Sequence, residues 1–103
     1  MKKVYIITCT AAASRVHEFT MTMVEFAFTS KAKAHKQLDI IKNKIGNGGW
    51  WNDADSNPKY GKVLSDTNIE NSPWGVLRDV LIESPNGIHE VFRLQELELN
   101  NGI

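Results

Sequence analysis

TSKAKAHKQLDIIKNKIG, residues 29–46, is the stretch that decides the fold, and its pattern predicts one amphipathic helix. Four apolar residues recur at the spacing that places them on a single stripe of an α-helix, namely Ala34, Leu38, Ile41 and Ile45. The hydroxyl of Thr29 or Ser30 can cap the first turn by accepting a hydrogen bond from an unpaired backbone N–H. Gly46 can end the helix, because glycine adopts the left-handed conformation without a Cβ clash. We therefore predict a helix over 29–46, flanked on both sides by β-structure that it covers.

Two strands precede this helix. Lys3–Thr10 contains four apolar residues in a row, Val4–Ile7, which indicates an interior position in a sheet. His17–Thr29 alternates between polar and apolar residues, but its apolar parity changes between Met23 and Val24. A β-bulge at this point would direct both halves to one face, whereas a twisted strand would bury a different face at each end. Because the two strands are close in sequence, we predict that they pair as an antiparallel hairpin.

The stretch after the helix, residues 46–75, is rich in Gly, Asn, Asp and Ser and is predicted as one long loop. A structureless loop of this length is unusual in a compact domain, so the segment should be functional or partly structured. Within it, Lys62–Ile69 can form either a short turn of helix or a short edge strand.

Two further strands follow the loop. Val76–Glu83 is predicted as the third strand, although a helix that starts at Pro73 is a competing pattern. The turn signal Ser84–Gly87 favours the strand, because Asn-Gly suits the turns of β-hairpins. Ile88–Leu99 is predicted as the fourth strand, with a second bulge or twist near Gln95. That expectation comes from a change of apolar parity, since Phe92 and Leu94 share one parity, and Leu97 and Leu99 share the other.

The predicted order is therefore strand, strand, helix, loop, strand, strand, which defines an α+β fold. One helix can cover one face of a four-stranded, mostly antiparallel sheet, and the other face then stays open. The 103 residues suit a single domain with one hydrophobic core.

Composition is that of an ordinary globular protein, with 42% hydrophobic and 23% charged residues and a net charge of zero. Cys9 is the one cysteine, so no intramolecular disulfide can form, and its apolar surroundings in sequence predict a buried, inert thiol. The N-terminal segment has the Val, Tyr and Ile content of a strand rather than of a signal peptide. No apolar stretch is long enough to span a bilayer. We therefore expect a soluble, cytoplasmic protein.

The most unusual residues gather in the long loop. Two adjacent tryptophans and three polar residues form a candidate interaction loop there: Trp50, Trp51, Asp53, Asp55 and Tyr60. Trp and Tyr offer large contact areas at low entropic cost, although the tryptophans can equally close the end of the core. The segment 53–57 resembles half of a calcium loop, but Pro58 replaces the required glycine and Leu64 the required glutamate. We therefore predict no metal site.

Catalytic signatures are absent from the sequence. His17 and His89 are each followed by a glutamate, but adjacent side chains of a strand point to opposite faces, so neither pair forms an acid–base dyad. A small enzyme would need His17, His89 and Glu90 to converge across strands. No phosphate-binding glycine loop precedes a helix, and no nucleophile motif is present. We therefore predict a non-enzymatic protein without a cofactor.

Two function classes remain. The first is an interaction domain that contacts a protein partner, or a second copy of itself as a homodimer, through a sheet edge, the open sheet face or the tryptophan loop. The second is a nucleic-acid-binding module, because residues 29–46 carry a formal charge of +4 whereas 47–103 carry −5. Its phosphate contacts would come from the helix lysines, which are Lys31, Lys33, Lys36, Lys42 and Lys44. No family signature stands out in the chain.

Overall fold

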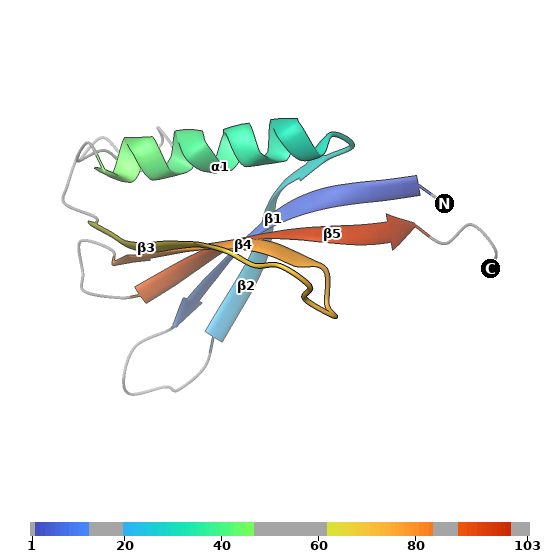
Figure 1. The fold of residues 1–103 in the computed structure, drawn as a ribbon. Coiled ribbons are helices and arrows are strands. Elements are labelled where there is room, and N and C mark those ends of the chain that lie inside the picture. Colours follow the sequence, from blue (N-terminus) through green and yellow to red (C-terminus); the bar gives the residue numbers. More distant parts are fainter. Residues whose placement is uncertain (1, 13–19, 47–61, 84–88, 100–103) are drawn as a thin grey trace.

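A computed structural model of the chain describes residues 2–12, 20–46, 62–83 and 89–99. The helices and strands in these ranges are β1 (Lys2–Ala12), β2 (Thr20–Phe28), α1 (Lys31–Gly46), β3 (Lys62–Asn68), β4 (Val76–Glu83) and β5 (His89–Leu99). The strands form one sheet in the order β2-β1-β5-β4-β3, and every neighbouring pair is antiparallel. The helix α1 lies across one face of this sheet (Figure 1), so the α+β class is confirmed.

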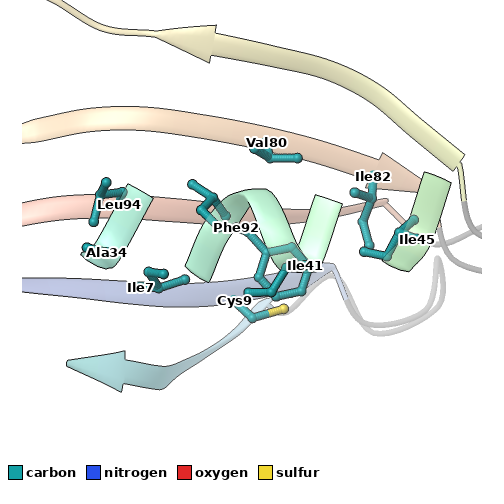
Figure 2. Close-up of a cluster of buried hydrophobic side chains, with 10 residues drawn as sticks. Ile7, Cys9, Ala34, Ile41, Ile45, Val80, Ile82, Phe92 and Leu94 are labelled. Carbon is teal, nitrogen blue, oxygen red and sulfur yellow. The ribbon is translucent and has the colours of Figure 1, made fainter. Parts of the chain in front are cut away.

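The predicted helix stripe forms the centre of the core. Ala34, Leu38, Ile41 and Ile45 all have 0% exposed surface. They pack on side chains from β1, β4 and β5 (Figure 2), which include Ile7, Val80, Ile82, Phe92 and Leu94. Of the two predicted caps, Ser30 is the one the structure uses. Its Oγ accepts a hydrogen bond from the Lys33 amide at 3.3 Å, and its carbonyl accepts one from the Ala34 amide at 3.1 Å.

The predicted bulge in β2 is confirmed. The predicted antiparallel pairing of β2 with β1 is confirmed as well. Ile7 pairs with Phe26 and Thr8 pairs with Val24, so Glu25 is the extra residue of β2. Met23 pairs with Cys9 and therefore shares the helix-facing side with Phe26. Since one inserted residue restores the register, the alternative of a strand that buries different faces at its ends is wrong for β2.

The prediction of four strands is wrong, because the sheet has five. The additional strand is β3, which lies inside the stretch predicted as a loop and pairs with β4 at the sheet edge. Of the two alternatives predicted for 62–69, the short edge strand is therefore correct and the turn of helix is wrong. Of its side chains, Val63 is the one that packs against the core cluster. An edge strand with one core residue shows little of the alternation by which strands are recognised. The segment 76–83 is a strand and not a helix, and its residues alternate between buried and half-buried.

For the last strand the sequence predicts a bulge or a twist near Gln95, and of these two the bulge is wrong. β5 pairs with β1 without interruption from Leu99 to Glu90, and the irregularity facing Gln95 lies on β4, between Val76 and Arg78. The change of apolar parity along β5 therefore means that its two ends direct apolar side chains to opposite faces of the sheet. Phe92 points to the helix side of the sheet, and Leu97 points to the other side.

Candidate interaction surface

The face of the sheet that points away from α1 carries an apolar patch, which we call the open-face patch. The strand register places its members on β1, β2 and β5, and they are Val4, Ile6, Val24, Leu97 and Leu99. Leu97 is opposite Val4 in the β1–β5 pair, and Val24 is opposite Thr8 in the β1–β2 pair. Cross-strand neighbours on one face approach within side-chain contact distance, so Val4 and Leu97 lie next to each other.

The outer members of the open-face patch are exposed to solvent. Leu97 is 38% exposed, Leu99 43% and Val24 63%, whereas Phe92 and Leu94 on the helix side of the same sheet are 0% exposed. A single helix covers one face of the sheet (Figure 1), which leaves these side chains outside the core. Clustered exposed apolar side chains, unlike scattered ones, mark a surface that binds something.

A closed ion pair lies in the middle of the open face. Arg93 of β5 is the register partner of Asp79 of β4. The guanidinium donates two hydrogen bonds to the carboxylate, from Nε to Oδ1 at 2.8 Å and from Nη2 to Oδ2 at 3.0 Å. This geometry raises the pKa of Arg93, with the Asp79 hydrogen bond as the main cause. Because the two charges neutralise each other, the middle of the open face has no unpaired ionic group from either residue.

Trp74 extends the patch from the turn between β3 and β4, which bends to the side of the sheet away from α1 (Figure 1). Its side chain is 77% exposed, although its backbone is fixed. The side chain of Gln95, on the open face, donates a hydrogen bond to the Trp74 carbonyl at 2.6 Å. The Glu96 amide donates to the Gly75 carbonyl at 2.8 Å. These two bonds place the turn beside the Leu97 end of β5.

Glycine is required at position 75 of this turn. Gly75 has a φ of +74°, in the left-handed region that disfavours other residues. A Cβ at this position would also collide with the carbonyl oxygen of Glu96. Glycine at this position therefore lets the turn pack closely against β5, with Trp74 exposed beside it.

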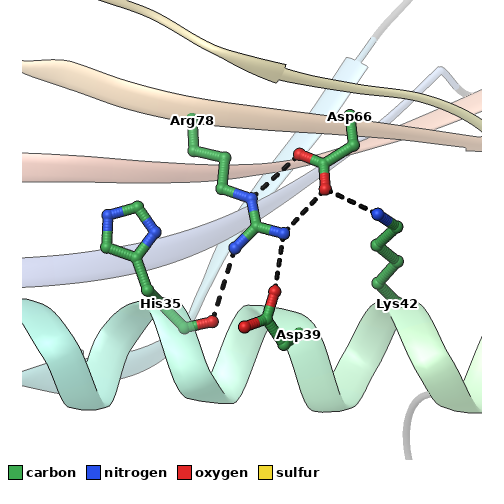
Figure 3. Close-up of polar contacts among 5 residues, drawn as sticks. All are labelled: His35, Asp39, Lys42, Asp66 and Arg78. Atoms are coloured by element: carbon green, nitrogen blue, oxygen red, sulfur yellow. Dashed lines mark hydrogen bonds and ion pairs between the residues drawn. The ribbon is translucent and has the colours of Figure 1, made fainter.

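The opposite side of the sheet holds a buried ion network that attaches α1 to β3 and β4 (Figure 3). Arg78 is 7% exposed. It donates to Asp66 from Nε at 2.9 Å and from Nη2 at 2.7 Å, and its Nη2 donates to Asp39 at 2.7 Å. Lys42 of α1 donates to the same Asp66 carboxylate at 2.8 Å. Arg78 and Lys42 hold the pKa of Asp66 well below its usual range, with the Arg78 hydrogen bond as the largest cause.

This network is an internal structural contact rather than a ligand site. Asp66 accepts from both cations, and Arg78 also reaches the His35 carbonyl at 3.5 Å. Burial, followed by the repulsion of Arg78, lowers the pKa of His35 and so favours its neutral form. The side-chain oxygens and guanidinium nitrogens thus satisfy one another, which leaves them little capacity for a substrate.

Cys9 is buried, as the sequence predicts, on the helix side of β1. Burial, with the nearby carboxylates of Glu90 and Glu25, raises the pKa of the Cys9 thiol to about 12. Burial and the repulsion of Glu25 likewise raise the pKa of Glu90. The Oε2 atom of Glu90 is buried and has no hydrogen-bond partner in the described part of the chain. A thiol that stays protonated at neutral pH does not act as a nucleophile.

The structure places the predicted site residues unevenly. The candidate interaction loop (Trp50, Trp51, Asp53, Asp55 and Tyr60) and His17 lie outside the described residues. His89 and Glu90 are adjacent on β5 and point to opposite faces, so they form no dyad. Within residues 2–12, 20–46, 62–83 and 89–99, no group of His, Cys, Asp or Glu side chains could hold a metal ion.

Sequence reasoning missed the residues that form this surface. In the sequence, Trp74 belongs to the apolar face of the competing helix that starts at Pro73 and is not predicted as a binding residue, although Ser-Pro-Trp-Gly at 72–75 is also a turn signal. Leu97 and Leu99 were noticed only as a change of parity. No family model, curated protein or solved structure matches the chain. In the segments that the structure describes, no helix is long and apolar enough to cross a membrane.

Proposed function

We propose that this chain is a non-enzymatic interaction domain that binds protein through the open face of its sheet. The open-face patch and the neighbouring Trp74 form the contact surface. The observation that carries the proposal is the 38–77% exposure of Leu97, Leu99 and Trp74, which lie on β5 and on the turn hydrogen-bonded to it. Tryptophan and clustered aliphatic side chains supply most of the binding energy in protein interfaces.

The open face is a better candidate than the two other surfaces that the sequence suggests. The outer edge β3 carries Lys62, and its Asp66 is engaged with Lys42 and Arg78. The other edge, β2, contains the bulge at Glu25, and bulges at an edge oppose the addition of a further strand. The tryptophan loop lies outside the described residues, and its role remains a prediction.

A matched pair of variants tests the proposal. Leu97→Arg places a charge in the open-face patch, and Ile40→Arg places the same charge on α1. Leu97 and Ile40 are equally exposed, at 38% and 40%, so the substitutions should perturb folding equally. Each purified, tagged chain is used to capture proteins from a lysate of the source organism, with half of each sample treated with nuclease.

We expect the wild type and Ile40→Arg to retain the same discrete protein, and Leu97→Arg to lose it. Nuclease should make no difference. Retention of that protein by Leu97→Arg would show that the open face is not the binding surface. Circular dichroism of each variant serves as the control for folding.

A nucleic-acid-binding module is the second candidate, because Lys31, Lys33 and Lys36 are exposed on the first turns of α1. Lys42 is less suited to phosphate contacts, since it is paired with Asp66. This candidate predicts oligonucleotide binding, and the logarithm of the binding constant should fall linearly with the logarithm of the salt concentration. Fluorescence anisotropy at low salt measures it, and absence of binding there would dispose of it.

A further inference from the structure

We propose that β3 is a detachable edge strand, which separates from β4 while α1 and the rest of the sheet stay folded, and that the Asp66 carboxylate holds it closed. The inference concerns the edge of the sheet and does not depend on the open-face patch. It follows from three properties of β3: its small apolar contact with the core, the hydrogen bonds of Asp66, and the attachment of the turn that follows the strand.

The apolar contact of β3 with the core is smaller than that of the other edge strand. Five of its seven residues are exposed to solvent, and Val63 is its one side chain that packs against the core cluster. The opposite edge, β2, contributes two partly buried aromatic side chains to this cluster, Phe26 and Phe28. Segments with few buried apolar contacts open locally at a lower free energy than the whole fold. We therefore expect β3 to separate before any other strand of the sheet.

The Asp66 carboxylate links β3 to both β4 and α1. It accepts hydrogen bonds from Arg78 Nε at 2.9 Å, from Arg78 Nη2 at 2.7 Å and from Lys42 Nζ at 2.8 Å (Figure 3). When β3 separates, Lys42 and Arg78 become accessible to water at the new edge, and Arg78 keeps its hydrogen bond to Asp39 at 2.7 Å. Opening therefore leaves no buried charge without a partner in this network, which is the condition that makes broken ion pairs costly.

The turn that follows β3 is attached to β5 rather than to β3. The Gln95 side chain donates a hydrogen bond to the Trp74 carbonyl at 2.6 Å. The Glu96 amide donates another to the Gly75 carbonyl at 2.8 Å. β3 can thus leave β4 while the chain stays anchored at this turn. Its departure uncovers the backbone of β4, and an unpaired strand edge is a template for pairing with another extended segment.

Native-state amide hydrogen exchange, followed by NMR at low urea concentrations, tests the inference. We expect β3 amides to exchange faster than β5 amides and with a smaller dependence on urea, because the opening of one edge strand exposes little surface. β4 supplies an internal comparison, since alternate residues of a central antiparallel strand direct their N–H groups to the neighbours on either side. Every second amide of β4 should therefore exchange with β3, and the others with β5.

Ile7→Val separates local opening from global unfolding. Ile7 is 0% exposed and lies on β1, which is separated from β3 by β5 and β4. The substitution destabilises the closed and the opened state equally, so β5 amides should exchange about three- to tenfold faster and β3 amides at an unchanged rate. An equal acceleration of β3 and β5 would show that β3 separates only when the whole chain unfolds, and would overturn the inference. Equal rates and equal urea dependence of the two strands in the wild type would overturn it as well.

A matched pair of variants tests the role of Asp66. Asp66→Ala should accelerate exchange of the β3 amides at least about tenfold, because it removes the acceptor of three hydrogen bonds that exist only in the closed state. Asp79→Ala breaks the Arg93 pair between β4 and β5, which stay paired in the opened state, so β3 exchange should change by no more than about twofold. Equal acceleration of β3 exchange by both variants would show that Asp66 does not hold the strand closed.

Discussion

Removal of the Asp66 carboxylate should destabilise the fold far more than removal of the Asp79 carboxylate. Both aspartates make a bidentate pair with an arginine, but the two pairs differ in burial. The side chains of Arg78 and Asp66 are 8% and 17% exposed, whereas those of Arg93 and Asp79 are 46% and 24% exposed. The two contacts therefore differ in burial, and Asp66 also accepts a hydrogen bond from Lys42.

The magnitude follows from what each substitution leaves behind. Asp66→Ala removes the acceptor of two Arg78 bonds at 2.9 and 2.7 Å and of the Lys42 bond at 2.8 Å, while the guanidinium stays buried. Breaking a buried pair from one side costs about 3–5 kcal/mol. Because Asp39 still accepts from Arg78 at 2.7 Å, we expect a value near the lower end, about 3 kcal/mol. Asp79→Ala leaves Arg93 in water and should cost about 0.5 kcal/mol.

Urea denaturation of the three proteins measures these free energies of unfolding, provided that the slopes agree. In thermal unfolding, the losses correspond to shifts of about 15 °C and about 3 °C for a chain of this size. Adding Arg78→Met to Asp66→Ala removes the unpaired charge, so the double variant should be no less stable than the single one. Equal losses for Asp66→Ala and Asp79→Ala, or a double variant clearly weaker than Asp66→Ala, would refute the reasoning.

Three further predictions concern single residues. Because the pKa of Asp66 is lowered by folding, its stabilising contribution is complete above the unfolded pKa of about 3.9 and is lost as pH falls below it. The stability difference between wild type and Asp66→Ala should therefore narrow in acid, which urea titrations at several pH values measure. The pKa of Glu90 is raised, so its charge opposes folding at neutral pH, and Glu90→Gln should raise the urea midpoint at pH 7 but not at pH 3. Gly75→Ala should lower stability by about 1–3 kcal/mol because of its positive φ and the collision with the Glu96 carbonyl, and an unchanged urea midpoint would contradict this.

The core could be predicted from the sequence because its signal is periodic. The helix stripe from Ala34 to Ile45 has the 3.6-residue repeat of a buried face, and all four of its members are fully buried. The bulge of β2 was equally readable, since the parity of its apolar residues changes at one point. In both cases burial imposes a pattern on residues that are neighbours in the chain.

β3 has no such periodic signal, so the sequence predicts it only as one of two alternatives, a short edge strand or a turn of helix. Its attachment depends on Asp66, whose partners Arg78 and Lys42 lie 12 and 24 residues away in sequence. A long-range ion pair of this kind produces no periodic pattern of apolar residues in the strand. One aspartate in an Asn- and Ser-rich stretch is instead typical of a turn. The strand exists because pairing with β4 satisfies its backbone and the ion network satisfies its one inward carboxylate.

The open-face patch is visible in the sequence as a change of apolar parity, which predicts a bulge or a twist near Gln95. The bulge alternative assumes that every apolar residue of a strand faces the helix, which holds only where the sheet has a single apolar face. A sheet of five strands is about 24 Å wide, and a helix of about 10–12 Å diameter covers one face of it at most. If the other face met only water, polar residues at the ends of β5 would satisfy it at no loss of stability. The chain instead places Leu97 and Leu99 there, beside the fixed turn of Trp74 and next to a neutral Arg93–Asp79 pair. This apolar end and the self-neutralised middle beside it are the reason why we propose that protein covers the open face.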